Sequence, residues 1–178
     1  MKKILRPIII VPALVGIISS FLIFLAIWEH RKENLHLKDS YTSNSSLPKG
    51  RMINLQTNQD DYEELKKGKV LLVFLTRGCD ACKKEIPNIA QALPSLAPKM
   101  AVYGVYIEER SEVERFIQEN QITFPILLDS GGRVFAGLGI TLIPAKVLLE
   151  DGTITKIWFG SSPNKSALIK DVGEVERQ

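Results

Sequence analysis

Apolar runs of strand length alternate with segments of helical periodicity over most of this chain. Val70–Leu75 and Ala101–Ile107 are apolar almost throughout, which is typical of strands buried on both faces of a parallel sheet. Between them, residues 86–93 carry apolar side chains three and four positions apart. This spacing predicts a helix that ends at Pro94, and strand, helix and strand together predict a βαβ unit.

Shorter elements are expected on both sides of this unit. The apolar pattern and the turn residues predict a strand at Met52–Leu55, a helix at Asp60–Lys67, a helix opened by a capping box at Ser111–Glu114, a strand at Phe124–Leu128 and a helical turn at Val134–Leu138.

A β-hairpin is the strongest local prediction in the C-terminal part. Ala145–Leu149 and Thr153–Phe159 are apolar runs that flank Asp151-Gly152, and Asp-Gly favours a tight hairpin turn. Ser162-Pro163 then predicts the start of a last helix. The order of elements indicates an α/β domain whose mixed sheet carries helices on both faces.

The N-terminal region has a different pattern. Pro7–Trp28 is an uncharged run of 22 residues, preceded by three cations. As a helix it would extend roughly 33 Å, enough to cross a bilayer, and the positive-inside rule places the N-terminus in the cytoplasm. A cleaved signal peptide and a buried soluble helix are the alternatives.

This pattern divides the chain into four parts. They are a cytoplasmic N-terminus at 1–6, a transmembrane anchor at 7–28, a polar flexible tether at 29–49 and a folded domain at 50–178. The predicted location is therefore the cell membrane, with a single span and the domain on the extracytoplasmic side.

Charge and composition exclude several classes of function. The net charge is +3, and Lys2, Lys3 and Arg6 account for all of it, so the remaining chain is formally neutral and offers no cationic surface for nucleic acid. The only histidines, His30 and His36, precede the domain, which excludes a Cys–His or Ser–His–Asp site within it. We expect no metal site and no cofactor.

The only two cysteines, Cys79 and Cys82, lie between a predicted buried strand and a predicted helix. At a helix start the free N–H groups and the helix dipole favour a thiolate, and a second thiol one turn later can close a disulfide with it. This arrangement favours thiol–disulfide exchange. A purely structural bridge, which would close a very small loop, and half of a zinc site shared between two subunits are the alternatives.

These residues resemble the thioredoxin superfamily, and in particular its membrane-tethered TlpA/ResA-like thiol–disulfide oxidoreductases. The resemblance covers about Pro48 to Val172. It rests on the Cys-x-x-Cys pair, on the Cys-x-x-Glu-x-Pro pattern at Cys82–Pro87, on the Gly-x-x-x-x-Pro pattern at Gly139–Pro144, which precedes a cis-proline in the family, and on the strand and turn at Val147–Gly152.

The resemblance implies a role for each site residue. Cys79 is expected to be the nucleophile and Cys82 the resolving thiol, while Glu85 is expected to tune the thiols and carry protons; an exposed helix acid is the alternative for Glu85. Ile143 and Pro144 are expected to form the substrate groove. A sixth residue, Gly78, follows Arg77 where the family usually has Trp, which flattens the substrate face beside Cys79.

The expected function is reduction of disulfides in exported proteins, such as apocytochromes during cytochrome c maturation, with electrons from a membrane donor. Asp80 supports a reductant, because its charge opposes a thiolate beside it. Two alternatives remain open. Thr76-x-x-Cys79 resembles the peroxiredoxin motif, although Leu72 stands where that family needs proline. A non-catalytic thioredoxin-like binding module is the other.

Overall fold

The computed structural model describes residues 20–21, 23–24, 40–41 and 44–173. The chain forms two units, Met1–Asp39 and Ser40–Gln178. The predicted N-terminal segment and most of the predicted anchor and tether lie outside the described residues. In the part of the chain that is described, no helix is long and apolar enough to span a bilayer.

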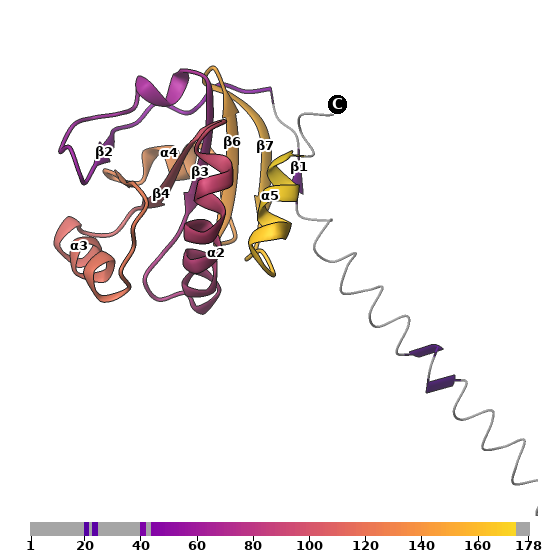
Figure 1. Ribbon diagram of the computed structural model, residues 1–178. Helices are drawn as coiled ribbons and strands as arrows, with labels where there is room; N and C mark the ends of the chain where they lie inside the picture. The colour runs from indigo at the N-terminus through magenta and orange to yellow at the C-terminus, as the bar shows by residue number, and fades with distance from the viewer. Residues whose placement is uncertain (1–19, 22, 25–39, 42–43, 174–178) are drawn as a thin grey trace, which may run out of the picture. The chain divides into compact units, whose positions relative to one another are not determined.

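The second unit is built on a mixed sheet of seven strands in the order β1-β7-β6-β3-β4-β5-β2 (Figure 1). The strands are β1 Ser40–Tyr41, β2 Met52–Asn54, β3 Lys69–Phe74, β4 Ala101–Tyr106, β5 Ile126–Asp129, β6 Ala145–Glu150 and β7 Thr153–Phe159. β3, β4 and β5 are parallel, whereas β6, β7, β1 and β2 join antiparallel. The predicted mixed sheet and hairpin are therefore confirmed.

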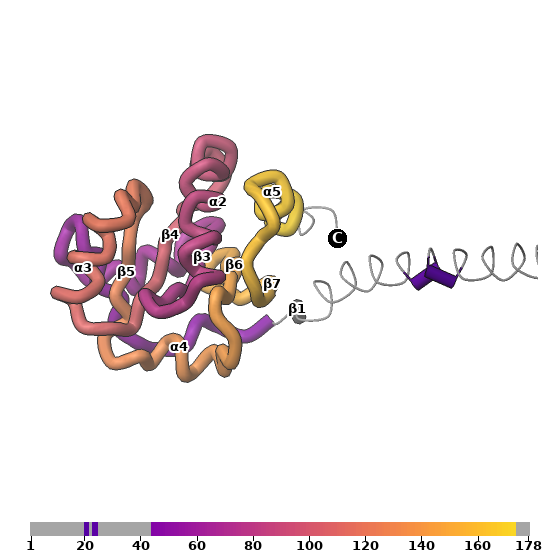
Figure 2. Tube along the Cα trace, turned by 90° about the horizontal axis from the view of Figure 1, so that it is seen from below, coloured from indigo at the N-terminus to yellow at the C-terminus, as the bar shows by residue number. Residues whose placement is uncertain are grey.

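Helices cover both faces of this sheet. They are η1 Glu64–Lys66, α2 Asp80–Leu96, α3 Arg110–Glu119, α4 Arg133–Gly137 and α5 Lys165–Gly173. The view in Figure 2 shows α2 and α5 on one side of the sheet and α4 on the other. This is the arrangement that the apolar runs predicted.

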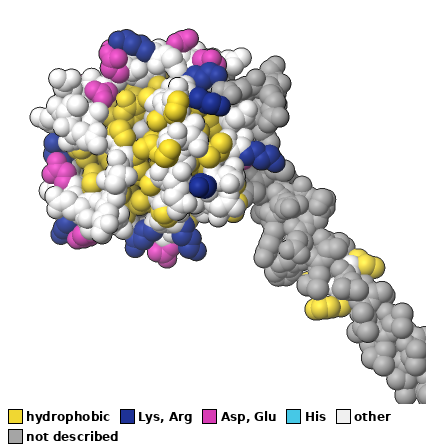
Figure 3. Space-filling model, in the orientation of Figure 1, with side chains coloured by type: hydrophobic (Ala, Val, Ile, Leu, Met, Phe, Trp, Pro, Cys, Tyr) yellow, Lys and Arg dark blue, Asp and Glu magenta, His cyan; other side chains and the backbone are white. Residues whose placement is uncertain are grey.

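The central strand β3 contributes to two cores because its side chains alternate between the faces. Leu71 and Val73 pack with α2, α3 and α5, whereas Leu72 and Phe74 pack with η1 and α4. All four side chains are buried. Burial on both faces explains why the strand has no polar alternation. On the face seen in Figure 3, hydrophobic side chains gather near the centre and most charged side chains lie at the rim.

The pairing of three strands brings distant segments to one edge of the sheet. β3 runs parallel to β4 and antiparallel to β6, and Phe74 pairs with both Val105 and Ala145. The residues that follow β3 and β4 and those that precede β6 therefore meet. The cysteine pair, the segment after Tyr106 and the Pro144 loop all belong to this edge.

The predicted helix at Asp60–Lys67 is wrong for most of its length, since only η1 forms. The Asp60 carboxylate instead accepts hydrogen bonds from the backbone N–H groups of Met52 and Tyr62, at 3.0 and 3.2 Å. A side chain that bonds local backbone in this way competes with the helix. Asp60 also bridges to Ile53, so the segment is held along β2.

Three predicted helix ends also differ from the structure. Glu109 rather than Ser111 is the N-cap of α3, and its carbonyl accepts the first turn's N–H groups. α2 continues through Pro94, because the next turn closes with an Ala97-to-Leu93 bond of 2.8 Å. α5 begins at Lys165, where the side chain of Asn164 accepts a bond from the Ala167 N–H. The predicted cap, Ser162, instead donates hydrogen bonds to Glu85.

Candidate active site

Cys79 is the N-cap residue of α2 and is partly exposed. Its extended backbone ends the loop that follows β3, and its Sγ accepts a hydrogen bond of 3.1 Å from the backbone N–H of Cys82. An N-cap side chain normally uses oxygen for this bond, and here sulfur receives it. The free N–H groups at the start of α2 therefore lie beside this sulfur.

Cys82 is the buried partner of this pair. Both thiols are free, and the Cys82 side chain hydrogen bonds to Cys79. Burial, and after it the hydrogen bond with Cys79, raise the pKa of the Cys82 thiol to about 12, while the hydrogen bond from the backbone of Thr76 opposes them. The two thiols thus differ as exchange chemistry requires: an accessible attacker and a protonated, shielded partner.

The protonated state of Cys82 predicts how the reduction potential varies with pH. We expect the reduction potential to fall by at least about 30 mV per pH unit between roughly pH 6 and 10. Reduction adds two electrons to the cysteine pair and one proton to Cys82, so the potential depends on pH. Equilibration with dithiothreitol at a series of pH values measures this slope. A potential that became independent of pH near pH 9 would show that Cys82 ionises far more easily than its burial implies.

The loop before β6 lies against the attacking sulfur. The Ile143–Pro144 peptide bond is cis, as the Gly-x-x-x-x-Pro resemblance implied. The Cys79 thiol contacts the Ile143 carbonyl oxygen at 3.8 Å, and Pro144 is buried while Ile143 is half-buried. Gly78 is exposed, with open space where a side chain would stand. The structure therefore places both loops beside Cys79.

Glu85 is buried on α2, so an exposed helix acid is excluded. Its Oε1 accepts an ion-pair contact of 3.0 Å from Lys146 Nζ, and both side chains are 0% exposed. Ser162 donates its N–H to Oε2 at 2.6 Å and its hydroxyl to Oε1 at 3.1 Å. Burial lowers the pKa of Lys146 below its ordinary value, against the opposing effect of Glu85. Glu85 follows Cys82 by three residues on α2, so the pair lies near the resolving thiol.

A second acidic residue, Glu108, supports the loop before Cys79. Its Oε1 accepts hydrogen bonds from the Thr76 hydroxyl and from the Arg77 N–H, the latter at 3.0 Å. The Arg77 guanidinium itself forms an ion pair of 2.6 Å with Glu112 of α3. The Arg77 guanidinium is thus held by α3.

Asp80 has little influence on the site by comparison. Its side chain is 93% exposed and contacts Lys83 Nζ at 3.9 Å. Water and this lysine screen its charge, which weakens the expected opposition to a thiolate at Cys79.

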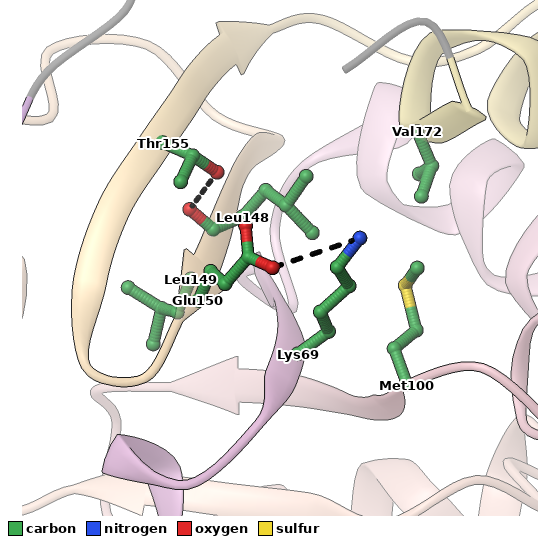
Figure 4. Close-up of a pocket in the computed structure, with 7 residues that line it drawn as sticks. All are labelled: Lys69, Met100, Leu148, Leu149, Glu150, Thr155 and Val172. Atoms are coloured by element: carbon green, nitrogen blue, oxygen red, sulfur yellow. Dashed lines mark hydrogen bonds and ion pairs between the residues drawn. The ribbon is translucent and has the colours of Figure 1, made fainter. Parts of the chain in front are cut away.

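A small pocket in the described part of the chain lies away from the cysteine pair. Within the described residues, no group of three or more His, Cys, Asp or Glu side chains is placed to hold a metal ion. The pocket lies at the far end of β3, where Lys69 and Glu150 form an ion pair of 3.8 Å (Figure 4). It is separated from Cys79 by the length of the strand.

Two residues of the site are not among those that the sequence predicts. Lys146 has the only signal, a charged residue inside the apolar run of β6. Glu108 stands in an acidic stretch after β4 and has no distinguishing feature in the sequence.

The fold is thioredoxin-like, and the dithiol has the arrangement that thiol–disulfide exchange uses. The AhpC/TSA family model matches residues 44–157, more than half of the chain, and the chain belongs to this family. The resemblance inferred from the sequence is thereby confirmed.

Relatives and solved structures agree with this class. Sporulation thiol-disulfide oxidoreductase A of Bacillus subtilis (strain 168) is 39% identical over 108 residues, which are 57% of this chain and 66% of that protein. Thiol-disulfide oxidoreductase ResA of Halalkalibacterium halodurans is 28% identical over 119 residues, 60% of this chain and 62% of that protein. The matches thus span just under two thirds of these relatives. The crystal structure of StoA from Bacillus subtilis has a TM-score of 0.60 at 29% identity and covers 71% of this chain and 98% of that one.

Proposed function

We propose that this protein exchanges disulfides with exported proteins through Cys79 and Cys82 and works as a reductant. The observation that carries the proposal is the asymmetry of the pair: Cys79 caps α2 at the surface, and Cys82 lies buried within hydrogen-bonding reach of it. Attack by Cys79 on a substrate disulfide gives a mixed disulfide. Cys82 then displaces the substrate thiol and closes the Cys79–Cys82 bond.

The environment of Cys82 supports the direction of the reaction. A dithiol becomes a strong oxidant when its reduced form is stabilised, usually as a thiolate. Here burial disfavours the Cys82 thiolate, so the reduced form gains little stabilisation from that sulfur. The electron pair is therefore readily passed to a substrate disulfide.

A flat, partly apolar surface beside Cys79 is where an unfolded or extended substrate would bind. Leu142 is 54% exposed and Ile107 is 40% exposed, and they adjoin the Pro144 loop and the end of β4 at the same sheet edge. Gly78 adds no side chain that would restrict access. Apocytochromes, whose paired cysteines must be reduced before haem attaches, are the substrates that we propose.

The apolar run at 7–28 completes the proposal. It would anchor the protein in the cell membrane, with its N-terminus in the cytoplasm and the dithiol outside, where disulfides form. After each turnover the oxidised pair must regain two electrons, and we propose a membrane electron donor as their source.

Trapping of substrates tests the proposal directly. In Cys82→Ser the mixed disulfide on Cys79 has no resolving thiol, so natural substrates should accumulate as covalent adducts that a reductant releases. Adducts recovered from membranes and identified by mass spectrometry should be exported proteins with paired cysteines. Cys79→Ser is the matched control and should trap none.

Two results would contradict the assignment. Adducts in Cys79→Ser but not in Cys82→Ser would reverse the roles of the two thiols. Failure of a membrane-impermeant thiol reagent to reach Cys79 in intact cells would contradict the location of the site.

A peroxidase is the second candidate, favoured by the AhpC/TSA match and by Thr76-x-x-Cys79. The Thr76 hydroxyl, however, is bonded to Glu108. Hydrogen peroxide consumption with a thiol donor separates the candidates, because a disulfide exchanger should show almost none.

A further inference from the structure

Two acidic side chains lie near the resolving thiol, and their hydrogen bonding differs. Both oxygens of Glu85 are occupied, Oε1 by Lys146 and Oε2 by the N–H of Ser162. Glu108 has one occupied oxygen, Oε1, whereas its Oε2 is buried and has no hydrogen-bond partner among the described residues. Glu108 therefore keeps one buried carboxylate oxygen whose lone pairs are open to accept a proton.

Thr76 connects Glu108 with Cys82. Its hydroxyl donates to Glu108 Oε1, and its backbone hydrogen bonds to the Cys82 thiol. Tyr106, at the end of β4, has a buried hydroxyl that also finds no partner among the described residues. Burial raises the pKa of Tyr106. Tyr106 and Cys82 belong to the same buried cluster, and Glu108 follows Tyr106 by two residues.

Building on the proposed function, we infer that Glu108 accepts the proton that Cys82 loses when it resolves the mixed disulfide. The Cys82 S–H bond breaks, and an O–H bond forms at Glu108 Oε2. The electron pair left on Cys82 Sγ forms the bond to Cys79 Sγ, while the bond from Cys79 to the substrate sulfur breaks. The substrate leaves as a thiolate and takes a proton from water, and Glu108 later returns its proton to solvent. The dithiol is oxidised by two electrons and the substrate disulfide is reduced.

Glu108 thus takes the proton-carrying role that the family resemblance gave to Glu85. In this chain Lys146 and Ser162 engage Glu85, so it is a positioning residue that holds α2 to β6 and to the segment before α5. The titratable and charged groups that face Cys82 and Glu108 are Cys79 at the start of α2, Glu85 within α2, Arg77 after β3, Tyr106 on β4, Glu112 on α3 and Lys146 on β6.

Two successive releases of thionitrobenzoate test the inference in the reduced full chain. The first release reports attack by Cys79 on a dithiobis-nitrobenzoate reagent, and the second reports resolution by Cys82. In Glu108→Gln the second release should slow by roughly 10²-fold at neutral pH, because a general base typically contributes that much. The first release should be unchanged, which also shows that the variant is folded. The pH profile of the second step should lose its acid limb and rise with hydroxide alone.

Three further variants make the result specific. Glu109→Gln removes the neighbouring, exposed carboxylate and should leave both steps as in the wild type. Glu108→Asp keeps a carboxyl group and should keep the acid limb. An acid limb that survives in Glu108→Gln, or that disappears in Glu85→Gln instead, overturns the inference. Absence of any second release from the wild type would overturn the proposed function itself, and so the two failures are distinguishable.

Discussion

Replacing Lys146 by methionine should destabilise the folded protein by roughly 3–5 kcal/mol, because it leaves the Glu85 carboxylate buried without its cation. Both side chains are fully buried, and Nζ lies 3.0 Å from Oε1. Methionine matches lysine in length and fills the same space, so the loss reports the ammonium group, with its ion pair to Glu85 and its hydrogen bond to the Gly160 carbonyl, rather than a cavity. The shift of the urea unfolding midpoint at neutral pH measures the effect.

The double variant Lys146→Met with Glu85→Gln should recover most of the lost stability. Glutamine is neutral: its carbonyl oxygen can accept the Ser162 N–H bond, and its NH2 group can donate to the Ser162 hydroxyl oxygen, so no unpaired charge remains buried. A double-mutant cycle then gives the coupling between the two residues. If the double variant is as unstable as the sum of the single ones, the pair does not act as a unit.

An exposed ion pair supplies the matched control. Lys67 Nζ lies 2.7 Å from Glu64 Oε1, a shorter contact than that of the buried pair, but both side chains are more than 60% exposed. Lys67→Met should therefore cost about 1 kcal/mol or less, since exposed pairs contribute little. An equal loss at both positions would mean that burial does not determine the effect.

Much of the fold was predictable because the central strands carry their own signals, whereas β1 lies in the segment predicted to be a tether. β3 and β4 lie at the centre of the sheet and are buried on both faces, so their apolar runs identify them without further context. The Asp151-Gly152 turn marks the β6–β7 hairpin in the same local way. Asp60 shows the limit of such signals. The bonds that prevent a helix there come from β2, which lies outside the segment whose pattern predicted the helix.

The residues of the site divide in the same way, into those with a local signal in the sequence and those without one. Cys79 and Cys82 are adjacent on one helix turn, and the proline loop has its own pattern, so local sequence was sufficient for them. Lys146 and Glu108 become site residues only through sheet pairing, which brings β6 and β4 to either side of β3. A lone lysine in an apolar strand suggests a solvent-facing position. Its burial depends on Glu85, a residue 61 positions earlier in the chain.

Replacing Cys79 by serine should lower disulfide reduction by roughly 10³-fold or more, because loss of a nucleophile removes the covalent step that the other residues serve. A serine hydroxyl is a far weaker nucleophile toward a disulfide sulfur than a cysteine thiol and forms no disulfide, so Cys79 Sγ has no chemical substitute. Turnover of a fluorescent disulfide peptide with dithiothreitol as electron source measures the loss, with the spontaneous reaction subtracted.

Cys82→Ser separates this effect from structural damage. The serine replaces a buried thiol yet leaves Cys79 at the N-cap of α2, so the first attack on the peptide should persist while turnover stops at the mixed disulfide. Unchanged turnover in Cys79→Ser, with normal binding of partners, would favour the non-catalytic binding module. Since Cys82 is shielded and its thiolate is disfavoured, it cannot replace Cys79 as the attacking sulfur. The order of the two steps is therefore set by where α2 begins.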